Sequence, residues 1–343
     1  NYLGLTHHPR VIAKAVEALK TYGTGSGAAR LVSGHNPLHQ ALEEALARFK
    51  GCARALVFPT GYMVNLAVIS TLANREDVIF CDRFCHASLL DGCLLSGAKL
   101  VRFQHNDPGS LRRLLSRHTG RRRFIVTEGV FSMDGDTAPL NELHALAGEF
   151  GLTLILDDAH GTGVLGPNGK GTAAAQNLPA EKIVTTGTLS KALASVGGFA
   201  AGSSLLIEYL LNRARPFIFT TALPPASAAA ALAALEVLEE EPEILARLRK
   251  NIERLHRRLA ACGLTGSKNS PIIPLILGSP ERALDASERL LKRGYYVPAI
   301  RPPSVPPGTA RLRITVSAAH TAAEIDGFAA AVAEVLEEVK GIA

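Results

Sequence analysis

Short apolar runs alternate with helix-like patterns along the first 200 residues, and this alternation constrains the fold more than any other feature. Runs such as 55–58 and 152–156 are short and mainly apolar, as in strands covered on both faces. Residues 10–22 place apolar side chains at helical spacing. Strands that alternate with helices form a mostly parallel sheet with right-handed crossovers. We therefore expect an α/β fold, with a mostly parallel central sheet flanked by helices.

The same patterns predict where the elements lie. Strands are expected at 55–58, 77–81, 123–127, 152–156, 182–185 and 198–201, and helices at 10–22 and 38–49 and from about residues 63, 88 and 140. Further along the chain we expect one long charged helix at 235–259, strands at 272–277, 295–297 and 312–315, a helix from about residue 282 and a last helix.

This division predicts a large domain at 15–240 and a smaller α+β domain at 241–343, after an N-terminal segment at 1–14. The chain opens without Met and reads like the interior of a protein, so we expect that further sequence precedes residue 1.

Composition excludes several classes of function. Of the 343 residues, 47% are hydrophobic and 20% charged, which favours a large core over disorder. The sequence has no uninterrupted apolar stretch of about 18 residues, so a membrane-spanning helix is not expected. The net charge of +6, without tryptophan or interleaved basic and aromatic residues, makes nucleic acid an unexpected partner. Five cysteines without a CxxC pair predict reduced thiols in a cytoplasmic protein and no metal site.

One familiar motif does not carry its usual meaning. Residues 161–166 read Gly-Thr-Gly-Val-Leu-Gly after a predicted strand, which matches the dinucleotide-binding pattern. That site also needs a helix that begins at once, so that its N-terminus meets the pyrophosphate. The next residues, Pro167-Asn168-Gly169-Lys170-Gly171, predict a loop. Dinucleotide binding is therefore not expected at this segment.

Polar segments follow the ends of three predicted strands. They are residues 128–135, 157–160 and 186–191, and the carboxyl ends of parallel strands are where α/β sheets bind ligands. A buried lysine can form a Schiff base with a carbonyl compound. A carboxylate can keep a pyridine nitrogen protonated, which makes the ring an electron sink. Together, these residues predict a site for pyridoxal 5′-phosphate (PLP).

At these motifs the chain resembles the α-oxoamine synthases, a family of PLP-dependent fold type I related to aspartate aminotransferase. The resemblance is strongest at Asp157-Asp158-Ala159-His160-Gly161 and Thr188-Leu189-Ser190-Lys191. It implies that Lys191 carries PLP as a covalent Schiff base and removes the substrate's α-proton. It also implies that Asp157 pairs with the pyridinium nitrogen and that His160 hydrogen-bonds the 3-oxygen of the ring.

The resemblance further implies how the phosphate is held. The backbone of Gly61 and Tyr62, at a helix start, and the hydroxyl of Thr188 would bind it. Thr220 and Thr221 resemble the family's phosphate contact from the neighbouring subunit. The expected enzyme is therefore a homodimer with shared active sites.

The same resemblance implies the substrates. His86 would stack on the ring and stabilise the oxyanion, Ser132 would help to seat the cofactor, Arg313 would bind the amino-acid carboxylate, and Ser304 would contact substrate. The loop at 25–34 and the segment around Ser304 favour L-alanine with a pimeloyl thioester, on CoA or on a carrier protein, giving 8-amino-7-oxononanoate for biotin biosynthesis. Glycine with acetyl-CoA is the alternative within the family. A non-catalytic family member is the alternative of another class.

Overall fold

The computed structural model describes residues 1–264 and 267–339, and the chain divides into two compact units. The first comprises Asn1, Leu3–Phe131 and Thr137–Pro242. The second comprises Tyr2, Ser132–Asp136 and the chain from Glu243 onward. Residues 265, 266 and 340–343 of the small domain predicted from sequence lie outside the described residues.

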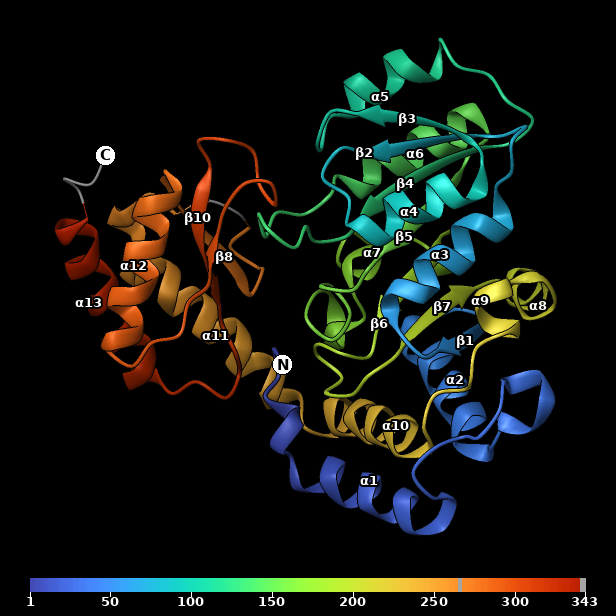
Figure 1. Ribbon diagram of the computed structural model, residues 1–343, viewed down its shortest axis with the longest axis horizontal. Coiled ribbons are helices and arrows are strands. Elements are labelled where there is room, and N and C mark those ends of the chain that lie inside the picture. The colour runs from blue at the N-terminus through green and yellow to red at the C-terminus, as the bar shows by residue number, and fades with distance from the viewer. Residues whose placement is uncertain (265–266, 340–343) are drawn as a thin grey trace. The chain divides into compact units, whose positions relative to one another are not determined.

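A seven-stranded sheet forms the centre of the first unit, with strand order β1-β7-β6-β5-β4-β2-β3 (Figure 1). Its strands are β1 (Arg54–Phe58), β2 (Val78–Asp82), β3 (Lys99–Phe103), β4 (Arg123–Glu128), β5 (Thr153–Asp157), β6 (Val184–Thr188) and β7 (Gly198–Gly202). The pairs from β3 to β6 are parallel, and β7 is antiparallel to both of its neighbours. The predicted, mostly parallel sheet is confirmed.

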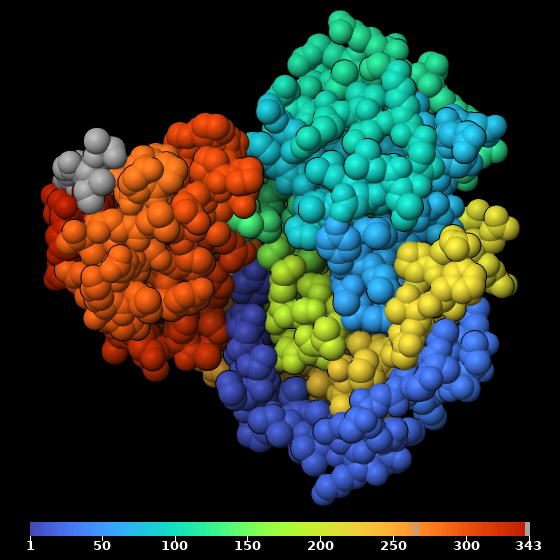
Figure 2. Space-filling model, in the orientation of Figure 1, coloured from blue at the N-terminus to red at the C-terminus, as the bar shows by residue number. Residues whose placement is uncertain are grey.

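The helices of the first unit cover the two faces of this sheet or pack against the helices that do. They are α1 (Pro9–Tyr22), α2 (Pro37–Lys50), α3 (Gly61–Leu72), α4 (Ala87–Ser96), α5 (Pro108–Leu115), α6 (Leu140–Phe150), α7 (Thr172–Ala175), α8 (Ser204–Arg213), α9 (Arg215–Ile218) and α10 (Pro225–Glu240). Short 3₁₀ turns lie at Leu5–His7, Pro167–Gly169 and Ala180–Lys182, and a π-helical turn at Arg30–Gly34. Helix α1, in blue, packs along α10, in gold (Figure 1), and parts of both helices are visible on the face shown in Figure 2.

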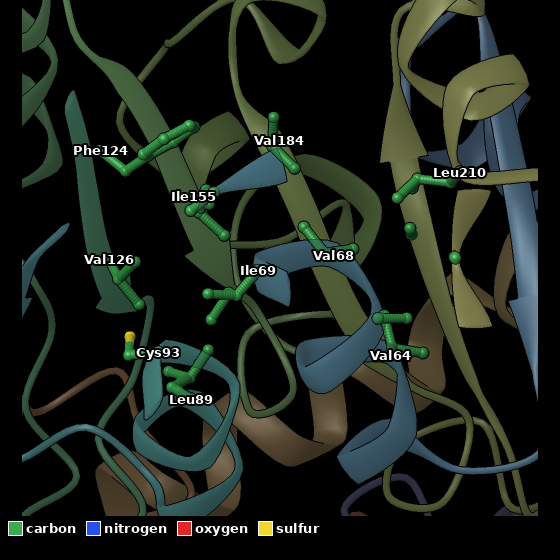
Figure 3. Close-up of a cluster of buried hydrophobic side chains, with 14 of the residues drawn as sticks. Val64, Val68, Ile69, Leu89, Cys93, Phe124, Val126, Ile155, Val184 and Leu210 are labelled. Atoms are coloured by element: carbon green, nitrogen blue, oxygen red, sulfur yellow. The ribbon is translucent and has the colours of Figure 1, made fainter. Parts of the chain in front are cut away.

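Each central strand supplies side chains to two separate cores, one on each face. In β4, Phe124 and Val126 enter the core beneath α3 and α4, whereas Ile125 between them enters the core beneath α5 and α6. Figure 3 shows the first of these cores, where Val64 and Val68 of α3 lie over the sheet. This alternation follows from the two-residue period of a strand. It explains why these strands are apolar throughout.

Side-chain caps fix where two of these helices begin. In α2, the Asn36 side chain accepts hydrogen bonds from the backbone N–H groups of Leu38 and His39, and His39 Nδ1 accepts from the backbone N–H of Asn36 at 3.2 Å. His39 Nε2 lies 2.7 Å from the carbonyl oxygen of Leu223, so both ring nitrogens of this buried histidine are used. Thr60 caps α3, because its hydroxyl oxygen accepts from the backbone N–H of Met63 at 3.1 Å.

The second unit holds a three-stranded antiparallel sheet with strand order β8-β10-β9. Its elements are α11 (Pro242–Arg258), a 3₁₀ turn (Ala260–Cys262), β8 (Ile272–Gly278), α12 (Pro280–Lys292), β9 (Ala299–Ile300), β10 (Ala310–Thr315) and α13 (Ala322–Glu338).

Two predictions for this part of the chain are wrong. The single helix expected at 235–259 is two helices, since α10 ends at Glu240 and Pro242 begins α11. Proline lacks the N–H that a continuous helix would need there. The strand expected at 295–297 is absent from the described residues of this segment, and a short strand forms at Ala299–Ile300 instead.

Among residues 1–264 and 267–339, no helix combines the length and the apolar character needed to cross a bilayer.

Candidate active site

Three neighbouring strands end at one cavity of about 290 Å³ in the first unit. Glu128 ends β4, Asp157 ends β5 and Thr188 ends β6. The residues around this strand-end cavity are Thr60, Gly61, Tyr62, Asn65, His86, Ser88, Glu128, Asp157, Ala159, His160, Gly187, Thr188, Ser190 and Lys191. Its volume is close to the lower end of the range for small-ligand sites, which is roughly 300 Å³. The structure thus brings together seven predicted site residues, those at positions 61, 62, 86, 157, 160, 188 and 191.

Asp157 is buried at the floor of the cavity, and both of its carboxylate oxygens accept hydrogen bonds. Asn65 Nδ2 donates to Oδ2 at 2.7 Å, and the backbone N–H of Ala159 donates to Oδ1 at 2.9 Å. A carboxylate whose two oxygens both accept is held in one orientation. Asp157 can therefore present negative charge to a group in the cavity, such as a protonated ring nitrogen.

A second buried carboxyl group, that of Glu128, is the register partner of Asp157 in the sheet. Its Oε1 accepts the backbone N–H of His86 at 2.6 Å, and its other oxygen has no hydrogen-bond partner among the described residues. Burial, and then the nearby charge of Asp157, raise the pKa of Glu128 well above its usual value. Two adjacent buried carboxyl groups favour one shared negative charge, which favours the protonated form of Glu128.

His86 is the N-cap residue of α4 and lines the cavity as an exposed residue. Its Nδ1 lies 2.8 Å from Ser88 Oγ, and the backbone N–H of Ser88 donates to the same nitrogen at 3.2 Å. Tyr62 meets the ring edge-on, with 6.1 Å between the ring centroids. Burial lowers the pKa of His86, which favours the neutral imidazole.

The first turn of α3 offers free donors at the cavity. Among the described residues, no acceptor binds the backbone N–H of Gly61 or of Tyr62. The packing leaves no space for a side chain here, because a Cβ on Gly61 would lie 3.1 Å from Thr188 Cβ and one on Gly198 would lie 2.6 Å from Gly61 Cα. Unpaired N–H groups at a helix N-terminus favour an anion. The residues present therefore fit PLP, with donors for its phosphate and a carboxylate for its ring.

Asp158, the next residue along, is fully buried and faces a different set of partners. Lys50 Nζ lies 2.7 Å from its Oδ2, and Thr172 donates both its backbone N–H and its hydroxyl to the same carboxylate. A Cβ on either Gly161 or Gly171 would overlap this carboxylate. The glycines at 161–171 thus let the chain wrap around Asp158.

The family model for aminotransferase class I and II matches residues 1–332. The 8-amino-7-oxononanoate synthase of Geobacter metallireducens is 51% identical over 324 residues, which cover 93% of this chain and 83% of the relative. The chain belongs to the α-oxoamine synthases, within aminotransferase class I and II. As a member of this family it is a PLP-dependent acyltransferase, as the sequence predicted.

Two further comparisons extend this family assignment. A Desulforudis audaxviator protein, named provisionally as an 8-amino-7-oxononanoate synthase, is 77% identical over 338 residues, which cover 98% of this chain and 88% of the relative. Serine palmitoyltransferase from S. paucimobilis, solved with a bound PLP adduct of myriocin, has a TM-score of 0.96 and is 38% identical. That alignment covers 100% of this α-oxoamine synthase and 87% of the solved chain.

The remaining predicted residues of this α-oxoamine synthase lie in other parts of the chain. Ser132, Ser304 and Arg313 belong to the second unit, where Arg313 Nε donates to the carbonyl oxygen of Ser132 at 2.6 Å. Thr220 and Thr221 follow α9, and Thr221 forms an isolated antiparallel bridge with Ala29. Their roles stay predictions.

Sequence reasoning gave no role to two polar residues at the cavity, Asn65 and Glu128. Asn65 is the one amide in the largely apolar helix α3, and Glu128 closes an apolar, buried strand. Burial makes such isolated polar side chains costly unless they are paired or functional. That cost is the signal that could have identified them.

Proposed function

We propose that this chain joins L-alanine to a pimeloyl thioester, with loss of CO₂, to give 8-amino-7-oxononanoate for biotin biosynthesis. The observation that carries the proposal is the 51% identity, along nearly the whole chain, to an enzyme of that name. The strand-end cavity supports it, since it offers a lysine, a carboxylate and unpaired helix N–H groups suited to PLP. The thioester would be carried by CoA or by a carrier protein.

The cofactor would be held by groups from several strand ends. Lys191 would bind it covalently through its amine, Asp157 would face its ring nitrogen, and His160 its 3-oxygen. The N–H groups of Gly61 and Tyr62 would bind its phosphate. When bound, PLP supplies an electron sink for negative charge at the substrate's α-carbon.

The side chains of this protein would then move protons and hold charge. The Lys191 amine, once released, would take the proton from the α-carbon and later return it. Asp157, fixed by Asn65, would hold the positive ring nitrogen. His86 would donate a hydrogen bond to the thioester oxygen as negative charge develops there. Glu128 would hold His86 through its backbone N–H.

Residues of the second unit would also have roles in the reaction. Arg313, which donates to the carbonyl oxygen of Ser132 on the same unit, would bind the substrate carboxylate through a bidentate pair of hydrogen bonds. Ser304 would contact the substrate.

We propose a homodimer in which Thr220 and Thr221 of one subunit bind the phosphate of the other. The free thiols support a cytoplasmic location.

The test is turnover of alanine, glycine and serine, each with pimeloyl-, acetyl-, succinyl- and palmitoyl-CoA, followed by thiol release and product mass. Activity confined to alanine with pimeloyl-CoA is the expected result. Preference for glycine with acetyl-CoA would overturn the proposed substrates. Lys191→Ala should abolish turnover, whereas Lys182→Ala, an exposed lysine on the same unit, should leave it unchanged.

A further inference from the structure

Asn65 connects the two sides of the strand-end cavity through buried hydrogen bonds. Its Nδ2 lies 2.7 Å from Asp157 Oδ2 and 2.9 Å from Ser88 Oγ, and its Oδ1 lies 2.7 Å from Thr186 Oγ1. Asn65, Ser88 and Thr186 are all nearly inaccessible to solvent. These side chains are therefore shielded from bulk water.

The chemistry of the groups fixes the direction of each bond that Asn65 makes. A carboxylate only accepts, so the amide nitrogen of Asn65 must face Asp157. Its carbonyl oxygen then faces Thr186, whose hydroxyl donates to it. The second amide hydrogen goes to Ser88 Oγ, which accepts it. The backbone N–H of Ser88 donates to His86 Nδ1, so this nitrogen is an acceptor, and the Ser88 hydroxyl, 2.8 Å away, must donate to it as well.

His86 Nδ1 consequently receives two hydrogen bonds, one from the Ser88 hydroxyl and one from the Ser88 backbone N–H. A nitrogen that accepts two donors cannot itself carry a proton. The single proton of the neutral ring must then be on Nε2. The lowered pKa of this imidazole agrees with the neutral form.

We propose that Asn65 and Ser88 are positioning residues that hold His86 as its Nε2–H tautomer and link the orientation of its ring to that of Asp157. In this form Nε2 donates a hydrogen bond to a substrate oxygen and cannot act as a base. Removal of the α-proton is then left to Lys191. The inference rests on the proposed function only in placing a substrate oxygen against His86.

The tautomer can be measured without substrate, by ¹⁵N NMR of protein labelled at its histidine rings and loaded with PLP. His86→Gln identifies the His86 resonances among the 11 histidines of the chain. We expect Nδ1 of His86 to resonate as an unprotonated acceptor and Nε2 as a protonated nitrogen. A protonated Nδ1 would overturn the inference. The turnover panel above is independent of this readout, so the two proposals fail separately.

Variants test whether Asn65 acts through Ser88. Ser88→Ala should shift the His86 Nδ1 resonance and lower kcat about three- to tenfold, the effect of one neutral hydrogen bond. Asn65→Leu should shift the same resonance, and the double variant should shift it no further than Ser88→Ala alone. Ser70→Ala, which removes a hydroxyl on α3 bound only to its own helix, is the matched control and should change neither.

An unchanged Nδ1 resonance in Ser88→Ala would overturn the role of Ser88, and additive shifts in the double variant would overturn the link through Asn65. If Asn65→Leu does not fold, the spectrum of the parent protein still decides the tautomer, and that of Ser88→Ala still decides the role of Ser88.

Discussion

Replacing Lys50 by Met should destabilise the first unit strongly, although Lys50 does not line the strand-end cavity. The Lys50 ammonium lies 2.7 Å from Asp158 Oδ2, 3.2 Å from Thr162 Oγ1 and 2.6 Å from the carbonyl oxygen of Lys170. Its side chain is 6% exposed and that of Asp158 is 0% exposed. Removing one partner of a buried ion pair costs about 3–5 kcal/mol, because the other charge stays buried. We expect about 3 kcal/mol, since Thr162 and Thr172 still donate to Asp158.

Urea unfolding at pH 7 measures this loss. Lys14→Met is the matched control, because the Lys14–Glu17 pair is exposed and should contribute less than about 1 kcal/mol. Adding Asp158→Asn to Lys50→Met should recover part of the stability, since no buried charge then remains. A Lys50→Met protein within about 1 kcal/mol of the parent would refute the reasoning, because that is the scale of an exposed pair.

Three further outcomes are expected. Burial lowers the pKa of His39 from 6.5 to about 4. Between pH 7 and pH 5 the unfolded chain therefore binds a proton at His39 that the folded chain does not bind, and the free energy of unfolding falls by about 2 kcal/mol. His39→Gln should flatten that dependence in denaturant titrations, and an identical slope would contradict it. Gly61→Ala should weaken PLP binding, measured by absorbance, because its Cβ would press on Thr188 at 3.1 Å; an unchanged Kd would count against the phosphate position. Asp157→Asn should slow exchange of the substrate α-proton by orders of magnitude, since an amide cannot hold a ring nitrogen protonated, and unchanged exchange by NMR would assign that role elsewhere.

Much of the fold was predictable because burial on both faces leaves a clear pattern. The apolar strands at the sheet centre and the helices that follow them appear where the sequence indicates. The edge strand β3 (Lys99–Phe103) is missing from the predictions, since Lys99 and Arg102 interrupt its apolar residues. An edge strand can expose such side chains, and its pattern is correspondingly weaker.

Site residues that stand in short sequence motifs were predictable, whereas those that only long-range packing brings to the cavity were not. Lys191, Asp157 and His160 stand in short motifs that the family resemblance assigns. Asn65 reaches Asp157 from a helix 92 positions away in sequence. Glu128, at the end of β4, accepts the backbone N–H of His86, which follows the neighbouring strand β2. Such pairings depend on strand order, which the sequence does not state.

Asp157 and Asp158 are adjacent in the chain, yet Asp157 lines the cavity whereas Asp158 binds Lys50 and Thr172 and holds the glycine-containing loop at 161–171. A mutational scan scored only by activity would rank substitutions of Gly161 and Gly171 as severe as those of Lys191, because a side chain there displaces the Asp158 carboxylate. Scoring the amount of folded protein as well would separate the two groups: loop substitutions would deplete it, and Lys191 substitutions would not. Intolerance to substitution in this segment therefore reports architecture and chemistry together.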